Sequence, residues 1–281
     1  MGMAGERTHL TSIHVYPVKA MRALDLNLSR VEPWGLAGDR RWLVVDLTGR
    51  FISQREEPSL ARVVASYEGL DLALTLATWG RDPITIPPPS AQAGAEMLPV
   101  SVWRSDLTAA AAGRAADEWL SDYLGRPVRL VHLDDPLRRP VDENYGAPGD
   151  TVSFADGYPL LLTNEASLDE LGKWLVDDGH EPVPMNRFRP SVVVGGAEPW
   201  DEDHWRRVRI GAVTFRVAKM CGRCVVTTTD QTTGEVGSQP LKMLGKKRKF
   251  GQDLVFGQNL IPDGTGVIRV GDDVEVLDRA S

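Results

Sequence analysis

Both cysteines of this 281-residue chain lie in one stretch, Lys219-Met220-Cys221-Gly222-Arg223-Cys224-Val225-Val226-Thr227-Thr228-Thr229-Asp230. Upstream of it, Val213, Phe215 and Val217 alternate with other residues, as in a half-buried strand. Downstream, two valines and three threonines are all β-branched, and they favour a second strand that ends at a Thr233-Gly234 turn. The stretch therefore predicts that the Cys-x-x-Cys pair lies between two strands of a β-rich fold.

The cysteine pair allows several interpretations. A redox pair of the thioredoxin type needs a helix N-terminus, which the strand-like residues after Cys224 do not favour. A second interpretation, that the cysteines are two apolar side chains packed inside a barrel, remains open because free cysteine is often buried. The cationic neighbours Lys219 and Arg223 instead favour a thiolate, the form that a soft metal binds. A structural zinc site would need four ligands. The five histidines show no paired spacing that would supply them: His9, His14, His132, His180 and His204.

Length and composition indicate a globular protein of one large or two moderate domains. The net charge of -7 opposes nonspecific binding to nucleic acid, so we expect no nucleic-acid partner. No apolar run approaches the roughly 20 residues that cross a bilayer, and the first residues lack the apolar core of a signal peptide. Since two cysteines make no disulfide framework, we expect a cytoplasmic protein that binds no membrane.

The first half of the chain is a series of short alternating runs separated by turn residues, typical of antiparallel sheet or barrel and not of βαβ units. A helix is predicted from Leu107 to Leu124, ending at Gly125 and Pro127. The predicted strands are Ile13/Val15, Trp42–Asp46, Phe51–Ser53, Leu60–Ser66, Leu70–Thr78 and Val128–Leu133, with turns at Thr48-Gly49 and Glu68-Gly69.

The polar segment 134–150 contains three prolines, and we predict that it connects an N-terminal domain, 8–133, to a second domain, 151–281. In the second domain, Thr163-Asn164 is a good cap for a helix that carries Leu168, Leu171 and Leu175. The predicted strands there are Tyr158–Leu162, Val192–Val194, Val208–Ile210, Val213–Val217 and a final hairpin, Val267–Val276. The predicted fold class is mainly β with a few helices (α+β), in two barrel-like units.

Cys221-Gly222-Arg223-Cys224, followed by Thr227-Thr228-Thr229-Asp230 and Thr233-Gly234-Glu235, resembles the core motif of the MOSC domain. That domain occurs in molybdenum-cofactor sulfurases and in the mitochondrial amidoxime-reducing component. Ala20 and Gly222 stand where many or some relatives have serine. Further motifs resemble, in order, an N-terminal MOSC β-barrel domain and the MOSC β-barrel domain itself: Tyr16-Pro17-Val18-Lys19, Gly38–Val44, Ser53–Pro58, Asn186–Ser191 and Phe256–Leu260.

The resemblance implies a molybdenum cofactor, in which a molybdopterin with an anionic phosphate tail holds the metal. Cys224 would be the molybdenum ligand and the catalytic residue. Arginine suits phosphate because its planar fork donates two parallel hydrogen bonds. For any one arginine, a salt bridge with Asp39 or Asp230 is an open alternative, and Thr163-Asn164 also serves as a plain helix cap. The implied cofactor-binding residues are Lys19, Arg40, Thr163, Asn164, Arg187, Arg189, Gly222 and Arg223.

The resemblance also implies a function, an oxidoreductase that reduces small N-hydroxylated substrates. The alternatives are a sulfur carrier or sulfurtransferase, or a carrier of the molybdenum cofactor; the chain has no room for the pyridoxal-phosphate-dependent desulfurase of the sulfurase fusions. An iron–sulfur cluster usually needs four cysteines, and no Gly-rich dinucleotide fingerprint is present. We therefore expect an external electron donor, such as a ferredoxin, flavodoxin or flavin reductase. The basic run Lys246-Lys247-Arg248-Lys249 is a candidate docking site for it, or else a solvated loop.

Overall fold

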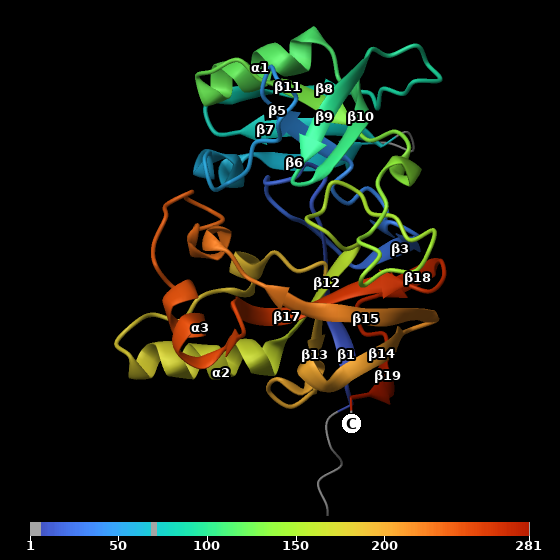
Figure 1. The fold of residues 1–281 in the computed structure, drawn as a ribbon. Helices are drawn as coiled ribbons and strands as arrows, with labels where there is room; N and C mark the ends of the chain where they lie inside the picture. The colour runs from blue at the N-terminus through green and yellow to red at the C-terminus, as the bar shows by residue number, and fades with distance from the viewer. Residues whose placement is uncertain (1–6, 69–71, 281) are drawn as a thin grey trace, which may run out of the picture.

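A computed structural model describes residues 7–68 and 72–280. The fold is mainly β, as predicted, and consists of two β-rich units that lie one above the other (Figure 1). The lower unit has a large sheet with β15 (Val213–Gly222), β17 (Asp253–Pro262) and β12 (Leu160–Asn164) at its centre, and the upper unit has two smaller sheets with α1 (Arg114–Leu124) on the outside.

The lower unit is built on a nine-stranded sheet, in which all residues of β12 (Leu160–Asn164) and β13 (Val192–Gly195) are buried. Its order is β19 (Val274–Arg279), β14 (Trp205–Ile210), β15 (Val213–Gly222), β17 (Asp253–Pro262), β12 (Leu160–Asn164), β13 (Val192–Gly195), β1 (His9–Val15) and β2 (Leu24–Leu26), with β16 (Lys249–Phe250) paired to β17. A three-stranded sheet, β18 (Gly266–Arg269), β3 (Leu28–Glu32) and β4 (Gly35–Leu36), packs against it through one shared core.

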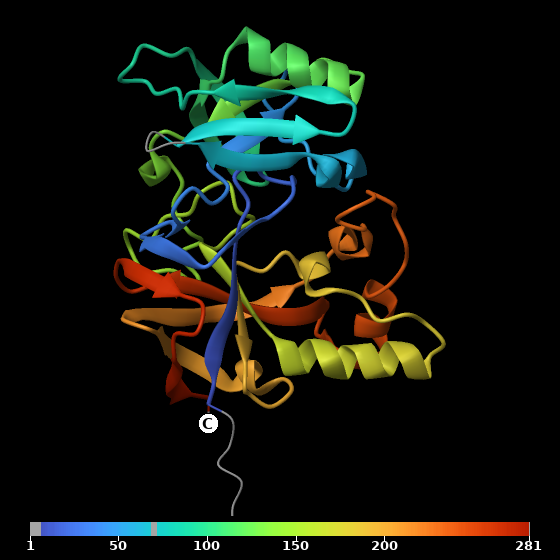
Figure 2. The ribbon, with the colours of Figure 1, turned by 180° about the vertical axis from the view of Figure 1, so that it is seen from behind.

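The first strands of the chain belong to the lower unit. β1 pairs antiparallel with β13, so that His9 lies opposite Gly195, and β3 pairs with β18. In Figure 2 the blue β1 begins at the bottom of the lower unit and runs upward through it. The N-terminal segment thus contributes to both units. The predicted domain bounds, 8–133 and 151–281, stay a prediction.

The upper unit contains two sheets and one helix. α1 (Arg114–Leu124) packs on β11 and ends at Gly125, which adopts a left-handed conformation (φ 67°), as predicted for a helix cap. Trp42 and Leu120 are fully buried in the core that these elements share. The sheets are β5 (Trp42–Val45), β11 (Arg129–His132), β10 (Ser105–Ala111) and β9 (Met97–Val102), and β6 (Val64–Glu68), β7 (Ala73–Thr78) and β8 (Arg81–Ile86).

Two helices cover one side of the large sheet, α2 (Glu165–Asp177) and α3 (Leu241–Lys247). α2 begins as predicted, because the Asn164 side chain accepts a hydrogen bond from the amide of Ala166. Short 3-10 helices complete the chain: η1 (Pro58–Arg62), η2 (Pro136–Arg138), η3 (Met185–Phe188), η4 (Asp201–His204) and η5 (Val225–Thr228).

The structure corrects several local predictions. The predicted helix from Leu107 begins only at Arg114, because Ser105–Ala111 is β10 and pairs along its length with β9. The predicted strand from Leu60 begins at Val64, after the Pro58–Arg62 turn. The predicted final hairpin is wrong, since β18 pairs with β3 while β19 pairs with β14. Gly69 and Leu70, in a predicted turn and strand, lie outside the described residues.

The segment after the cysteines is also corrected. Val225–Thr228 forms the 3-10 helix η5 and not a strand. β-branched residues disfavour longer helices but tolerate one turn, and here the Thr227 and Thr228 hydroxyls donate to the carbonyls of Cys224 and Val225. The chain therefore turns away from β15 directly after Cys224.

Within residues 7–68 and 72–280, no helix is long and apolar enough to cross a membrane.

Candidate active site

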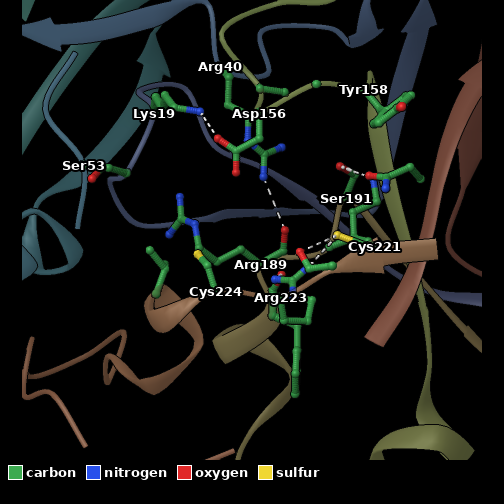
Figure 3. Close-up of a pocket in the computed structure, with 18 of the residues that line it drawn as sticks. Lys19, Arg40, Ser53, Asp156, Tyr158, Arg189, Ser191, Cys221, Arg223 and Cys224 are labelled. Atoms are coloured by element: carbon green, nitrogen blue, oxygen red, sulfur yellow. Dashed lines mark hydrogen bonds and ion pairs between the residues drawn. The ribbon is translucent and has the colours of Figure 1, made fainter. Parts of the chain in front are cut away.

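A pocket that is open to solvent lies where the two units meet. The upper unit contributes Phe51, Arg55 and Trp103 to its wall, and the lower unit contributes β15 and the segment before β12. Figure 3 shows Lys19 and Arg40 on one side of this pocket and the two cysteines with Arg223 on the other. Six of the predicted site residues line it: Lys19, Arg40, Arg189, Gly222, Arg223 and Cys224.

The two cysteines occupy different backbone positions. Cys221 is the second-last residue of β15, which ends at Gly222. Cys224 lies in the connection after it, immediately before the 3-10 helix η5. Both are free thiols of intermediate exposure that line the pocket. Arg223 donates to the Cys221 sulfur at 2.9 Å and to the carbonyl of Phe188 at 2.6 Å. The cationic neighbour predicted for Cys224 is thus hydrogen-bonded to Cys221.

Arg40 and Arg189 form one cationic group in the pocket wall. The centre of each guanidinium lies 4.2 Å from the centroid of the buried Tyr16 ring. Arg40 also donates to Asp39 at 2.5 Å and to the carbonyl of Arg189 at 3.3 Å. Burial lowers the pKa of Arg189 to about 10, so this site disfavours an uncompensated positive charge. The salt-bridge alternative holds for Arg40, yet Arg40 lines the pocket as well.

Lys19 projects into the same pocket from the loop after β1. Its ammonium donates to the carbonyl of Phe154 at 2.9 Å and to Asp156 Oδ1 at 2.5 Å. Burial lowers the pKa of Lys19 to about 8, although Asp156 opposes this shift. Desolvation by the surrounding pocket residues would raise the pKa of Asp156, but the nearby Lys19 charge and hydrogen bonds from Lys19 and Trp103 hold the pKa of this carboxyl well below its usual range.

Three predicted site residues do not reach the pocket. Thr163 and Asn164 are fully buried at the start of α2. The Asn164 amide is committed to the helix cap, to the carbonyl of Glu198 and to Glu202. Arg187 pairs with Asp230 at 3.1 Å and donates to the carbonyl of Thr228, so the salt-bridge alternative describes it. The helix cap explains Asn164 without a ligand.

The structure adds residues that the sequence interpretation missed. Asp156 and Trp103 line the pocket and are hydrogen-bonded to each other at 3.1 Å. Gln54 lines it as well and joins the two units through paired amide bonds with Gln231 at 2.9 and 3.0 Å. Gln54 lies within a motif that the sequence singles out, whereas Asp156 and Trp103 carry no local signal of a site.

Comparison with known proteins finds matches to two domain families. Residues 7–127 match the MOSC N-terminal beta barrel domain and residues 149–275 match the MOSC domain. The chain is 31% identical to mitochondrial amidoxime-reducing component 1 of Xenopus laevis, over 96% of this chain and 82% of that protein. It is 29% identical to the Homo sapiens protein of that name, over 95% and 82%. It is also 27% identical to the molybdenum cofactor sulfurase of Bos taurus, over 87% of this chain and 30% of that protein.

Proposed function

Because the chain belongs to the family of proteins that join an N-terminal MOSC β-barrel domain to a MOSC domain, we propose that it is a molybdenum-cofactor-dependent oxidoreductase. Its reaction would remove the oxygen of small N-hydroxylated compounds: the N–O bond breaks, two electrons and two protons are taken up, and water leaves. The observation that carries this proposal is that Cys224 shares one pocket with Lys19, Arg40, Arg189 and Arg223.

The lining residues fit an anionic cofactor that contains a soft metal. A thiol is present for the metal, and the described lining residues include several cations but only one carboxylate, that of Asp156. The Nε of Arg223 is buried and has no hydrogen-bond partner among the described residues. Burial lowers the pKa of both Lys19 and Arg189, and a phosphate beside them would offset that cost of burial.

In this proposal Cys224 holds the metal, while Lys19, Arg40 and Arg189 hold the phosphate of the pterin. The cofactor supplies the two-electron chemistry when bound. The protein's own residues position it: Arg223 bridges the Cys221 sulfur and the carbonyl of Phe188, and this fixes the loop that presents Cys224. Phe51 and Trp103, whose ring centroids lie 4.7 Å apart, add aromatic surface to the pocket wall.

The proposal includes an external electron donor such as a ferredoxin, flavodoxin or flavin reductase, and a cytoplasmic location, which two free thiols favour. The sulfur-carrier alternative uses the same thiol. It is supported by the likeness to the molybdenum cofactor sulfurase, of which this chain spans less than a third. In that case Cys224 would carry a persulfide, and no pterin would be retained.

The test uses protein expressed in a host that makes the cofactor. We expect about one molybdenum and one pterin per chain, and turnover of an N-hydroxylated amidine with a small chemical reductant. Cys224→Ser should abolish turnover and lose most of the metal, because a hydroxyl is a poor ligand for a soft metal. Cys221→Ser should keep most of both and serves as the matched control. Absence of molybdenum from the unmodified protein would contradict the proposal. A persulfide on Cys224, found by mass spectrometry, would favour the sulfur-carrier alternative.

A further inference from the structure

Two buried glutamines join the two units beside the candidate active site. Gln54, in the segment before η1, is 2% exposed, and Gln231, in the connection between η5 and α3, is 5% exposed. Their side-chain amides bond reciprocally. Gln54 Nε2 donates to Gln231 Oε1 at 3.0 Å, and Gln231 Nε2 donates to Gln54 Oε1 at 2.9 Å. Since burying polar groups costs free energy unless each is satisfied, the other partners of this pair indicate its role.

The other partners of the glutamine pair belong to the pocket. Gln54 Nε2 also donates to the carbonyl of Ala20 at 2.6 Å, and Ala20 follows Lys19 and lines the pocket. Gln231 Oε1 also accepts a hydrogen bond from Arg189 Nη1 at 2.8 Å. A carbonyl can only accept and a guanidinium can only donate, so these two partners fix the orientation of both amides. The pair therefore connects the loop that carries Lys19 to the side chain of Arg189.

The turn that carries Gln231 is held in place by its own hydrogen bonds and by the upper unit. The Asp230 carboxylate accepts hydrogen bonds from two backbone amides of the turn, at 2.8 and 2.9 Å. Gly234, in the same turn, lies so close to η1 that an added Cβ would be 3.1 Å from the carbonyl oxygen of Pro58. Gln231 is thus presented to Gln54 by a turn that packs against the upper unit.

Arg189 differs from Arg40 in the charge of the group that holds it. Arg40 donates to the carboxylate of Asp39, which compensates its charge. The guanidinium of Arg189 makes its one hydrogen bond within the described part of the chain to the amide oxygen of Gln231, and no described carboxylate lies at salt-bridge distance from it. A carboxylate at position 231 would hold the guanidinium equally well but would cancel its charge. A neutral amide fixes the geometry and leaves the charge available.

We propose that Gln54 and Gln231 are positioning residues for an anion in the pocket: they hold Arg189 through a neutral acceptor and so leave its charge for the ligand. The bond from Gln54 to Ala20 sets the Lys19 loop against the same pair. These two cations therefore keep their spacing only while the units are joined. This inference rests on the proposed function, in which the anion is the phosphate of the pterin.

The test titrates inorganic phosphate onto the full-length chain, expressed in a host that does not make the cofactor, at constant ionic strength and with phosphorus NMR as the readout. Gln231→Glu should lower phosphate affinity by about tenfold or more, because its carboxylate would pair with Arg189. Gln231→Met keeps a similar shape but loses one neutral hydrogen-bond acceptor, and should lower the affinity by only about two- to fivefold. Gln92→Glu is the matched control. It adds the same charge at an exposed position outside the pocket, and the affinity should stay within about twofold of the unmodified value.

A double-mutant cycle tests whether the two glutamines act as one pair. Gln54→Met should lower phosphate affinity about as much as Gln231→Met, and the double variant should lose little more than either, because both changes break the same contact. Losses that multiply in the double variant would contradict this coupling. In a host that makes the cofactor, molybdenum per folded chain should fall less in Gln231→Met than in Gln231→Glu, and should not fall in Gln92→Glu.

The inference is overturned if the unmodified chain does not bind phosphate, or if folded Gln231→Glu binds it as the unmodified chain does. Equal losses in Gln231→Glu and Gln231→Met would also overturn it, because the charge of the partner would then not matter. Should Gln231→Glu fail to fold, unchanged phosphate affinity in the two methionine variants overturns it. Phosphate binding that depends on Gln231, in a protein that never loads molybdenum, would contradict the proposed function and leave this inference standing.

Discussion

Arg187 and Arg189 are two residues apart, but their guanidinium groups have different surroundings. Arg187 belongs to a 3-10 turn and pairs with Asp230 outside the pocket. Arg189 has a left-handed backbone, with a φ of 53°, and its side chain instead reaches the pocket, Tyr16 and Gln231. The local change of backbone direction therefore separates a structural ion pair from a candidate ligand-binding cation.

Arg189→Ala should reduce cofactor affinity by about 10- to 100-fold, since a hydrogen bond to a charged group contributes roughly 1.5–3 kcal/mol. Arg187→Ala is the matched control. It should lower thermal stability, because it leaves Asp230 unpaired, while molybdenum per folded chain stays near the unmodified value. Metal analysis of both purified variants checks this. Equal cofactor loss in the two variants would contradict the distinction.

Lys19 provides a test by pH. Its pKa of about 8 means that the ammonium is charged below pH 8 and becomes neutral above it, so its attraction for phosphate is present at pH 7 and lost as the pH rises. Affinity for free cofactor should fall by up to about tenfold per pH unit above pH 8. Lys19→Arg should remove this decline, because arginine stays charged. Cofactor loading measured from pH 6.5 to 9.5 decides the matter; the same decline in both proteins would assign it to another group.

At the scale of elements, β17 is the strand that links the sheet to the site. It pairs with β12 and β15, and Phe256 stacks on Phe188 at 3.8 Å directly beneath the pocket. Gly257 allows β17 to lie close to β12. Its φ is 81°, and an added Cβ would lie 2.6 Å from the carbonyl oxygen of Leu162. A side chain at this position must move either β17 or β12.

Gly257→Ala should therefore lower the free energy of unfolding by at least about 2 kcal/mol, from backbone strain and the steric clash together. Gly251→Ala is the matched control. Gly251 also has a positive φ, of 58°, but an added Cβ would meet no atom within 4 Å, so only the strain of about 1 kcal/mol remains. Denaturant unfolding of both variants measures the difference, and similar losses would show that β12 moves aside easily.

At the scale of the whole molecule, the basic run 246–249 is less uniform than its sequence indicates. Arg248 is buried and pairs with Asp203, and Lys246 pairs with Asp178 at 2.8 Å. Lys247 and Lys249 remain exposed. This segment adjoins α3, which packs on η5, the turn that follows Cys224. A donor protein docked there would approach the candidate metal site from behind that turn.

If an acidic donor binds at this surface, Lys247→Glu/Lys249→Glu should slow its reduction of the protein about tenfold or more at low salt and weaken the salt dependence, through loss of electrostatic steering. Turnover with a small chemical reductant should not change. Arg114→Glu/Arg269→Glu alters the net charge equally at exposed positions on α1 and β18, and should have little effect. Unmodified rates in the lysine variant would place the donor elsewhere.

Local sequence patterns predict the class of fold, and the family motifs predict residues that line the pocket. Alternating apolar residues and turn residues predict the strands. The helix cap at Asn164 and the helix end at Gly125 can also be predicted, because each depends on a few neighbouring residues. Motif order predicts the MOSC relationship, and the pocket does contain Cys224 with Lys19, Arg40 and Arg189. Each of these features depends on a residue's near neighbours or on a motif.

Other features of the molecule depend on contacts between distant parts of the chain. The segment 105–111 is a strand because β9 pairs with it, although its alanines suit a helix. β18 and β19 separate because β3 and β14 offer different partners. Asp156 joins the pocket wall where Lys19, 137 residues earlier, and Trp103, 53 residues earlier, donate to the same carboxylate oxygen. No local pattern encodes such a meeting, because the folded backbone alone brings these side chains together.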